Sequence, residues 1–230
     1  MDRRKFRREG EEKRRDQLIN AALEIIAESG PEGATVRAIA ARAGVTQGLI
    51  RHYFTGKEEL TRAAYQALMA RMTADNESVL RDLGDDPRTR LAAFVAAALR
   101  PPVMDETSLA MWAGFLNMVR KSPEMATVHE AYYLDYRQRM ERLITALPGA
   151  RTPADLRRLG IACTAVIDGL WLEGSVYGRG FEGDELAGIG VRSVSDLLGT
   201  DLEPFLMAPV PRREQGATAP ATQTTKESAT

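Results

Sequence analysis

The feature that most constrains the fold is the helical spacing of apolar residues, which runs through nearly the whole chain. At 15–29, for example, Leu18, Ala22 and Ile25 fall on one stripe with a period of 3.6 residues. No segment shows the alternation of apolar and polar residues typical of a β-strand, and no tandem repeat is present. The sequence therefore predicts an all-α protein. The expected helices are 15–29, 36–43, 47 to about 55, 57–83, 87–100, 106–120, 123–147, 153–177 and 184–198.

Glycine and proline mark the boundaries between these helices. SGPEGAT at 29–35 ends the first helix, GDDP at 84–87 closes the helix that begins at 57, and Pro101–Pro102 stops the next one. The tail has almost no large apolar residue after Val210, which is typical of disorder. The expected organisation is a disordered basic arm at 1–12, a domain at 13–56, a larger domain at 57–208 and a disordered tail at 209–230.

Charge is unevenly distributed along the chain. The formal net charge is −1, but residues 1–57 hold 12 Lys/Arg against 8 Asp/Glu, whereas the remainder holds 19 against 24. A basic N-terminal end on a nearly neutral chain indicates local contact with a polyanion.

Several classes of protein are not expected. The single cysteine, Cys163, excludes an intramolecular disulfide, and two histidines argue against a zinc site, so we expect no metal and no cofactor. The first residues lack the apolar core of a signal peptide, and no stretch approaches the ~20 apolar residues that span a bilayer. We therefore expect a cytoplasmic protein with no membrane partner.

Gly44 is the centre of a pattern typical of a helix-turn-helix. Glycine adopts a turn conformation that a side chain resists, and Ala40 is small where a second helix would cross. An ordinary αα-hairpin in an all-helical protein would show a similar pattern. The surrounding packing positions are Ile39, Ala40, Ala43, Val45, Ile50 and Tyr53.

If Ile50 and Tyr53 face inward, the other side of the same short helix is free to face outward. Glutamine pairs bidentately with adenine and arginine with guanine, so this face suits the DNA major groove. Thr46 and the backbone amides at the helix start can hold a phosphate. The outward residues are Gln47, Gly48, Arg51 and His52.

The segment TVRAIAARAGVTQGLIRHYFTGKEEL at 35–60 resembles the DNA-binding segment of the TetR family of bacterial repressors. The similarity covers about residues 13–60. The family motif commonly ends in Leu-Tyr-Tyr-His-Phe followed by Lys-Glu-x-Leu, where this chain reads IRHYF and KEEL. The His-Tyr-Phe variant at 52–54, together with Gly48, is similar to the BetI-type branch, as is VIDGLWL at 166–172.

The resemblance implies an all-α homodimer with three N-terminal helices that bind DNA and about six C-terminal helices that bind ligand and dimerise. It also implies a transcriptional repressor of a palindromic double-stranded operator, relieved by a small-molecule effector. A ligand-induced, pendulum-like shift of the helix at 57–83 would change the spacing of the recognition helices. The expected DNA-contact residues are Arg15, Thr35, Thr46, Gln47, Gly48, Arg51, His52, Tyr53 and Lys57.

In this family the last two long helices of each subunit form a four-helix dimer interface. Small residues on 153–177 would let helices approach closely, and the last helix has an apolar stripe. An intramolecular core would explain the same stripes. The expected interface residues are Gly160, Thr164, Ile167, Gly174, Ile189 and Leu197.

The BetI-type resemblance implies an effector related to choline, which favours aromatic faces and a carboxylate. Other cationic or apolar compounds fit as well, and the aromatic residues could equally be core. Asp168 is the sharpest candidate because a carboxylate in an apolar helix is costly unless paired, although an arginine across the dimer interface could also pair with it. The expected effector-binding residues are Trp112, Phe115, Tyr132, Tyr133, Asp168 and Trp171, with Tyr136 as a further candidate.

Enzymatic functions find little support. GRGFEG at 178–183 matches G-x-G-x-x-G but follows a predicted helix, and no βαβ unit surrounds it, so dinucleotide binding is not expected. Two non-enzymatic functions besides an effector-controlled repressor stay open. A DNA binder without an effector would not need the large domain at 57–208, and a helical protein-interaction module would leave the outward Gln47–Arg51 face unexplained.

Overall fold

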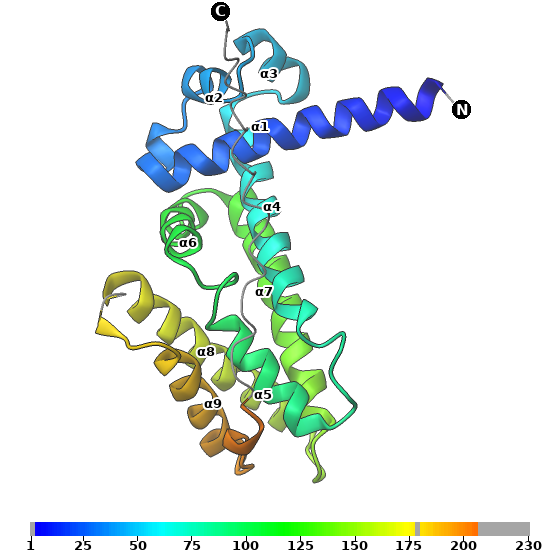
Figure 1. Cartoon of the computed structure of the whole chain (residues 1–230), viewed down its shortest axis with the longest axis vertical. Coiled ribbons are helices and arrows are strands. Elements are labelled where there is room, and N and C mark those ends of the chain that lie inside the picture. Colours follow the sequence, from blue (N-terminus) through cyan, green and yellow to red (C-terminus); the bar gives the residue numbers. More distant parts are fainter. Residues whose placement is uncertain (1–2, 178–179, 207–230) are drawn as a thin grey trace, which may run out of the picture.

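The predicted all-α architecture is confirmed. The computed structural model describes residues 3–177 and 180–206, with side chains described from residue 10 onward, and every regular element in this part of the chain is a helix (Figure 1). The predicted tail at 209–230 and residues 178–179 of GRGFEG lie outside the described residues. The elements are α1 (Arg3–Gly33), α2 (Val36–Arg42), α3 (Gln47–Tyr53), α4 (Lys57–Ser78), α5 (Pro87–Ala98), α6 (Glu106–Val119), α7 (Pro123–Thr145), α8 (Pro153–Tyr177), α9 (Glu185–Leu198) and the 3-10 helix η2 (Glu203–Phe205).

Helix α1 is longer than the sequence predicted at both ends. The prediction of a disordered arm at 1–12 is wrong for residues 3–12, which continue α1 outward, because their arginine, lysine and glutamate residues are good helix formers. At the other end, helical backbone resumes from Pro31 to Gly33 after a kink at Gly30, where φ is 69°. Glycine tolerates this left-handed conformation, so SGPEGAT bends the helix before ending it.

Two threonines and a proline begin helices where the sequence predicted. The Thr35 side chain accepts a hydrogen bond from the Ala38 amide at 3.1 Å, and Thr46 accepts one from the Leu49 amide at 3.4 Å. Pro87 occupies the first turn of α5, where its missing N–H costs nothing. These caps determine where α2 and α3, the two helices of the motif, begin.

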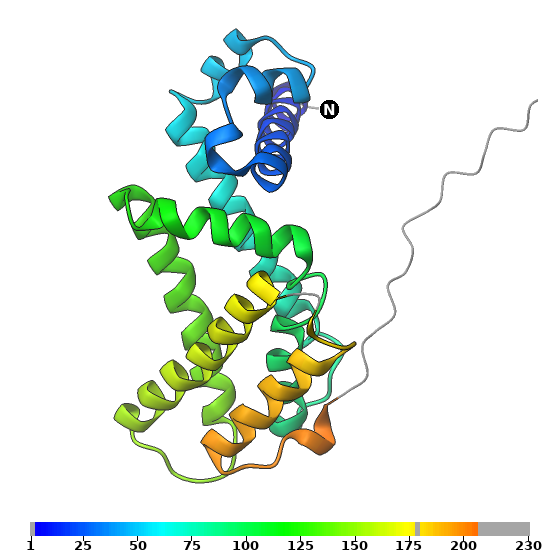
Figure 2. The same ribbon diagram turned by 90° about the vertical axis from the view of Figure 1, so that its left-hand side faces the viewer.

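Buried side chains form two clusters along the length of the molecule. The upper cluster joins α1–α4 and also includes Phe115 of α6 and Val128 of α7. The lower cluster joins α5–α9. Helices α4 and α7 run between the two ends, and α6 crosses beneath α1 (Figures 1 and 2). The contact of α1 with α6 is close, since Pro31 Cδ would lie 3.2 Å from a Cβ at Gly114, so the upper core continues past residue 56.

Helix α8 is the described helix with enough length and apolar composition to cross a membrane, with a mean hydropathy of 1.4 over 18 residues. The sequence predicted no stretch of this kind. Cys163, Ile167 and Trp171 of α8 are buried in the lower cluster, and the helix packs against α7 and α9. Packing within the subunit buries 33% of this window, so it accounts for a part of the apolar composition.

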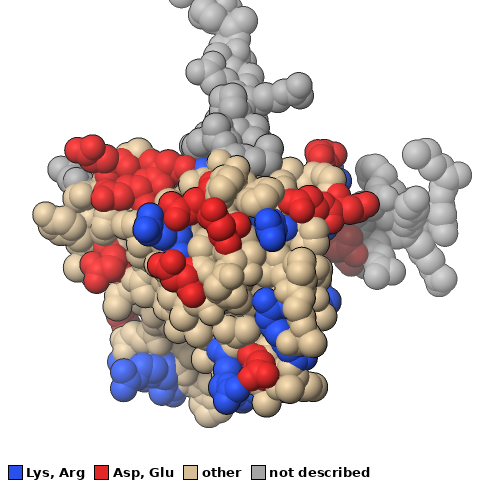
Figure 3. All heavy atoms as spheres, turned by 90° about the horizontal axis from the view of Figure 1, so that it is seen from below, with Lys and Arg blue, Asp and Glu red and all other residues tan. Residues whose placement is uncertain are grey.

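The two ends of the molecule differ in charge. Residues 1–57 carry the basic excess of the sequence, and α1–α3, which belong to this segment, form one end of the molecule. Figure 3 views the opposite end, where acidic side chains gather along one edge of the visible face and Lys and Arg side chains along the other. A polyanion is therefore expected at the α1–α3 end.

Candidate nucleic-acid interface and ligand pocket

Helices α2 and α3 meet through a tight turn centred on Gly44, where φ is 64°. The Val45 amide donates a hydrogen bond to the Ala40 carbonyl at 2.9 Å, which draws the turn back onto α2. Ile39, Ala40 and Ile50 are buried between the two helices and the rest of the upper core. This geometry confirms the predicted helix-turn-helix.

Helix α3 presents one face to solvent at the α1–α3 end of the molecule. Its exposed positions are Gln47, Gly48, Arg51 and His52. A Cβ at Gly48 would meet just Thr46 Oγ1, at 3.8 Å, so no packing within the described subunit requires glycine there. Tyr53 is half-buried against the upper core, and its ring and the His52 ring are nearly perpendicular at a centroid distance of 5.1 Å.

The remaining predicted DNA-contact residues surround this face and also serve the fold. Thr35 and Thr46 accept backbone hydrogen bonds as caps, which leaves each hydroxyl proton available to a phosphate oxygen. The Arg15 guanidinium lies 5.1 Å from the centre of the Phe54 ring, so α1 contacts the end of α3. Lys57, half-buried, opens α4 directly after the motif.

An ion-pair cluster that the sequence analysis missed joins α2 to α1. Arg42 lies 3.1 Å from Glu24 Oε2 and 2.5 Å from Glu28 Oε2. Hydrogen bonding to Arg42 lowers the pKa of Glu28, and hydrogen bonding to Glu28 raises the pKa of Arg42. These side chains are exposed, so the ion pairs add little to the free energy of unfolding. Their main effect is to orient α2 on α1. The signal in the sequence is a pair of glutamates four residues apart on one face of α1.

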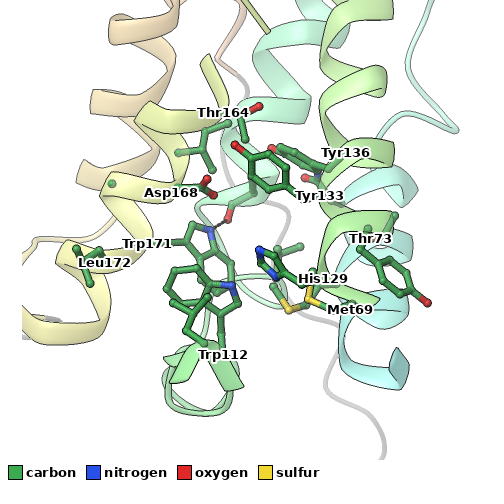
Figure 4. Close-up of a pocket in the computed structure, with 18 residues that line it drawn as sticks. Met69, Thr73, Trp112, His129, Tyr133, Tyr136, Thr164, Asp168, Trp171 and Leu172 are labelled. Carbon is green, nitrogen blue, oxygen red and sulfur yellow. Dashed lines mark hydrogen bonds between the residues drawn. The ribbon is translucent and has the colours of Figure 1, made fainter. Parts of the chain in front are cut away.

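A pocket of about 470 Å³ lies between α4, α6, α7 and α8 (Figure 4). Its size is in the range of sites for small organic ligands. Methionine, tryptophan and tyrosine side chains make up much of its wall. Five of the six predicted effector residues line it, namely Trp112, Tyr132, Tyr133, Asp168 and Trp171, and Tyr136 does so as well.

The aromatic wall is held in place by contacts among the residues that line the pocket. The Trp171 indole N–H donates to the Ala98 carbonyl at 2.9 Å, and the rings of Trp112 and Trp171 lie 5.6 Å apart between centroids. The rings of Tyr133 and His129 are stacked at 6.0 Å. The pocket therefore offers preformed aromatic faces, which attract cations.

Asp168 brings a carboxyl group into this aromatic pocket. Within the described part of the chain it has no hydrogen bond and no ion-pair partner. Burial raises its pKa to about 6, so the group is charged at neutral pH. Burial and then the nearby Asp168 raise the pKa of Tyr133 and Tyr136, and Figure 4 places Asp168 beside Tyr133 and Thr164. The site holds a half-buried carboxylate that no described residue of its own subunit neutralises.

A hydrogen bond connects the pocket to the upper core. His129, which lines the pocket, lies with Nδ1 2.6 Å from Tyr65 Oη, and the donor depends on the imidazole tautomer. Burial lowers the pKa of His129, which favours the neutral ring. Tyr65 is fully buried on α4 and packs on Phe115 at a ring distance of 4.7 Å. The sequence did not indicate His129 as a pocket residue, because a lone histidine on a helix carries no signal of its surroundings.

Phe115 is the predicted effector residue that the structure places elsewhere. It is fully buried in the upper cluster against Tyr65, and it does not line the pocket. Trp112 and Phe115 are three residues apart on α6, yet Trp112 lines the pocket whereas Phe115 is buried in the upper cluster. Helical spacing grouped them, but tertiary packing separates them.

Four of the six predicted dimer-interface residues also lie inside the subunit and not on its surface. Thr164 and Ile167 are buried and line the pocket. Gly160 allows close packing of Glu141, whose Cγ would lie 2.7 Å from a Cβ there, and Gly174 lies against Met104. These four residues make contacts within the subunit or line its pocket. The remaining two predicted interface residues, Ile189 and Leu197, are exposed.

These features define a class of protein: a helix-turn-helix regulator with a separate ligand pocket. Residues 18–64 match the model of bacterial regulatory proteins of the tetR family, and residues 87–199 match that of the C-terminal domain of BetI-type transcriptional repressors. The chain belongs to the TetR family and is of the BetI type. Both models describe transcriptional regulators, so the protein is not expected to be an enzyme and its class is that of a DNA-binding regulator.

Individual relatives agree with this assignment. The chain is 34% identical over 176 residues to the HTH-type transcriptional regulator BetI of Stenotrophomonas maltophilia, covering 75% of this chain and 86% of that protein. It is 31% identical to BetI of Burkholderia thailandensis, with coverages of 74% and 85%. Among solved structures, a transcriptional regulator from Pseudomonas aeruginosa PAO1 is 30% identical with a TM-score of 0.74, covering 84% of this chain and 94% of that one.

Proposed function

We propose that this protein is a homodimeric repressor that binds a palindromic operator and releases it when a small organic cation enters the pocket. Family membership supports DNA binding and repression. The observation that carries the ligand class is Asp168, a half-buried carboxyl group among aromatic rings without a cationic partner in the described subunit. The protein would act in the cytoplasm, where its DNA target lies.

The proposed dimer would place the two α3 helices in successive major grooves, about 34–36 Å apart. Support for a dimer comes from the exposed apolar faces of α8 and α9. Large exposed hydrophobic side chains are rare on monomers when they gather on one surface. In the described part of the chain they are Leu172, Val176, Tyr177, Ile189 and Leu197, all on these two helices.

Structures that share the fold do not decide the ligand. A regulator from Saccharomonospora viridis, 19% identical with a TM-score of 0.65, was solved in complex with choline. The fatty acid degradation regulator FadR from Bacillus halodurans is 22% identical with a TM-score of 0.64. In this chain, a fatty acid carboxylate near Asp168 would meet a like charge, whereas an ammonium group would be attracted both to the carboxylate and to the aromatic faces.

Two measurements test the proposal. Footprinting with genomic fragments is expected to reveal a palindromic site, and thermal unfolding with quaternary amines, polyamines and fatty acids is expected to show stabilisation by an amine class. The stabilising amine should then release the footprint. A dimer that binds no DNA above the nonspecific level would refute the repressor, and a footprint unaffected by every stabilising compound would favour a DNA binder without an effector.

A further inference from the structure

The N-terminal part of α1 extends beyond the rest of the described molecule. Residues 10–17 of this helix are all exposed, and its buried positions begin at Leu18, where the match to the tetR-family model also begins. Figure 1 shows this end of α1 projecting past α3 and α4 with no other described helix beside it. The helix before residue 18 is therefore not explained by packing in the upper core.

The outer end of this projecting helix is strongly basic. Five of the six residues from 3 to 8 are arginine or lysine. The dipole of a helix favours acidic residues in the first turn, and the first turn of α1 holds none. Cations there, spaced four residues apart, repel one another and oppose the dipole, so they weaken the helix. These residues, called the basic end below, are Arg3, Arg4, Lys5, Arg7 and Arg8.

A polyanion would compensate this charge, and the sequence favours nucleic acid over a lipid surface. A helix that lies on a membrane buries an apolar stripe, whereas Phe6 is the one large apolar residue in the sequence from 3 to 17. Duplex DNA requires no such stripe, because it offers about one phosphate charge per 1.7 Å of its axis. The outward face of α3 lies at the same end of the molecule.

The basic end is continuous with the DNA interface described above. The Arg15 guanidinium lies 5.1 Å from the centre of the Phe54 ring, at the end of α3. At a rise of about 1.5 Å per residue, the helix axis at Arg8 is about 10 Å, and at Arg3 about 18 Å, further out than at Arg15. In Figures 1 and 2 this end of α1 points away from the side that carries α8 and α9.

We propose that the basic end is a second DNA-contact element, which continues α1 as a helix and contacts phosphates of the duplex flanking the site bound by α3. DNA binding itself follows from family membership, while the outward direction rests on the dimer proposed above. Contacts of this kind add affinity and salt dependence without reading sequence. The protein would thus occupy more DNA than the two major grooves that its α3 helices enter.

The test compares two duplexes, the footprinted genomic site with its flanks and the same site trimmed to the bases that α3 covers. Fluorescence anisotropy measures both affinities at about 50 and about 200 mM salt. If the two basic ends of a dimer each neutralise one phosphate, wild-type protein should lose about tenfold more affinity for the flanked duplex than for the trimmed one.

The decisive variant replaces all five basic residues of 3–8 by glutamine, which forms helices about as well as arginine and lysine. It should lose affinity for the two duplexes alike as salt rises. A charge-matched control replaces five exposed arginines near the α4–α5 and α7–α8 connections, at the opposite end of the molecule, and should keep the wild-type difference. These are Arg81, Arg88, Arg142, Arg157 and Arg158.

Gly10 tests whether the basic end acts as a continuous helix with the rest of α1. Its backbone is helical, and a Cβ there would meet nothing within 4 Å, so Gly10→Ala strengthens the helix without a clash. Gly10→Pro keeps every charge but breaks the helix. The advantage of the flanked duplex should stay or rise in Gly10→Ala and fall in Gly10→Pro. An advantage that Gly10→Pro keeps in full would refute the continuous helix.

A third probe separates failure of this assignment from failure of the proposed function. On a mixed-sequence duplex of about 40 base pairs without the site, the glutamine variant should bind more weakly than wild type and with a shallower salt dependence. If no genomic fragment is footprinted, the palindromic repressor is refuted, and this duplex still tests the basic end.

Equal salt dependence of wild type and the glutamine variant on every duplex would refute the assignment, as would an equal loss in the charge-matched control. Phosphatidylserine vesicles test the alternative partner. Binding to vesicles that depends on the basic end, without such a dependence on DNA, would also refute the DNA contact and assign residues 3–8 to a lipid surface.

Discussion

Asp168 is an ionisable carboxyl group in a pocket lined largely by aromatic and apolar side chains. Burial raises its pKa to about 6, whereas an aspartate in the unfolded chain titrates near pH 4. Between these values the folded protein binds the extra proton, so this carboxyl lowers stability progressively as the pH rises from about 4 through about 6. Asp168→Asn is therefore expected to raise the unfolding temperature more at pH 7.5 than at pH 4.5.

Differential scanning calorimetry at the two pH values measures this difference. Glu173→Gln is the control, since Glu173 is exposed on the same helix and makes the same change of charge. It should shift the unfolding temperature by a similar small amount at both pH values. An Asp168→Asn shift that does not depend on pH would contradict the raised pKa.

Arg51 and Lys57 are expected to play different roles in DNA binding. Arg51 is exposed on the outward face of α3, whereas Lys57 opens the next helix beside the motif. If Arg51 reads a guanine, Arg51→Ala should cost about 1–3 kcal/mol of operator binding and relax discrimination at one base pair. Lys57→Ala should weaken all sequences alike and flatten the salt dependence. Equal losses on operator and unrelated DNA from both variants would refute base reading by Arg51.

At the scale of helices, the predictions that proved correct were those based on local signals in the sequence. Gly44 and the Thr46 cap act on neighbouring backbone, so their roles follow from the sequence alone. The small residues of α8 were misassigned because a glycine indicates close approach without indicating what approaches. Gly160 faces Glu141 of α7, which is a neighbour fixed by the tertiary fold. Asn76 was not predicted as a pocket residue for the same reason. Its buried amide has no hydrogen-bond partner among the described residues, and this depends on the cavity around it.

The exposed faces of α8 and α9 carry a prediction about assembly. Leu197→Glu on α9 would place a charge within an apolar interface, where an unpaired carboxylate is costly. The variant is expected to be largely monomeric by light scattering and to bind the operator weakly. Gln138→Glu adds the same charge at an exposed site on α7 and should leave the dimer unchanged. A dimeric Leu197→Glu variant would exclude this face of α9 as the interface.

At the scale of the whole molecule, the DNA-binding end and the pocket share structural elements. Helix α4 contributes Leu60 and Tyr65 to the upper core, and it contributes Met69, Thr73 and Asn76 to the pocket wall. Helix α6, which also contributes to the pocket wall, packs on α1. A ligand that displaces α4 would thus act on the helix that follows the motif, which is the physical basis for a pendulum-like shift.

The Tyr65–His129 hydrogen bond is the most specific link in this arrangement, because His129 lines the pocket and Tyr65 does not. Tyr65→Phe removes the bond but keeps the ring against Phe115, so choline should bind the free protein within about twofold of wild type. If the bond transmits occupancy, the variant should need several-fold more choline to release the operator. Linkage then requires that operator DNA lower choline affinity less in the variant than in the wild type.

Titrating choline with and without operator, and operator with and without choline, measures this coupling from both directions. Thr61→Val, one turn earlier on α4, changes a buried hydroxyl without touching His129 and should keep the wild-type coupling. The reciprocal design matters because a weaker pocket and a weaker coupling both raise the choline needed for release. A ratio of affinities that is equal in wild type and Tyr65→Phe would exclude this hydrogen bond as the link and leave transmission to the packing of α4 and α6.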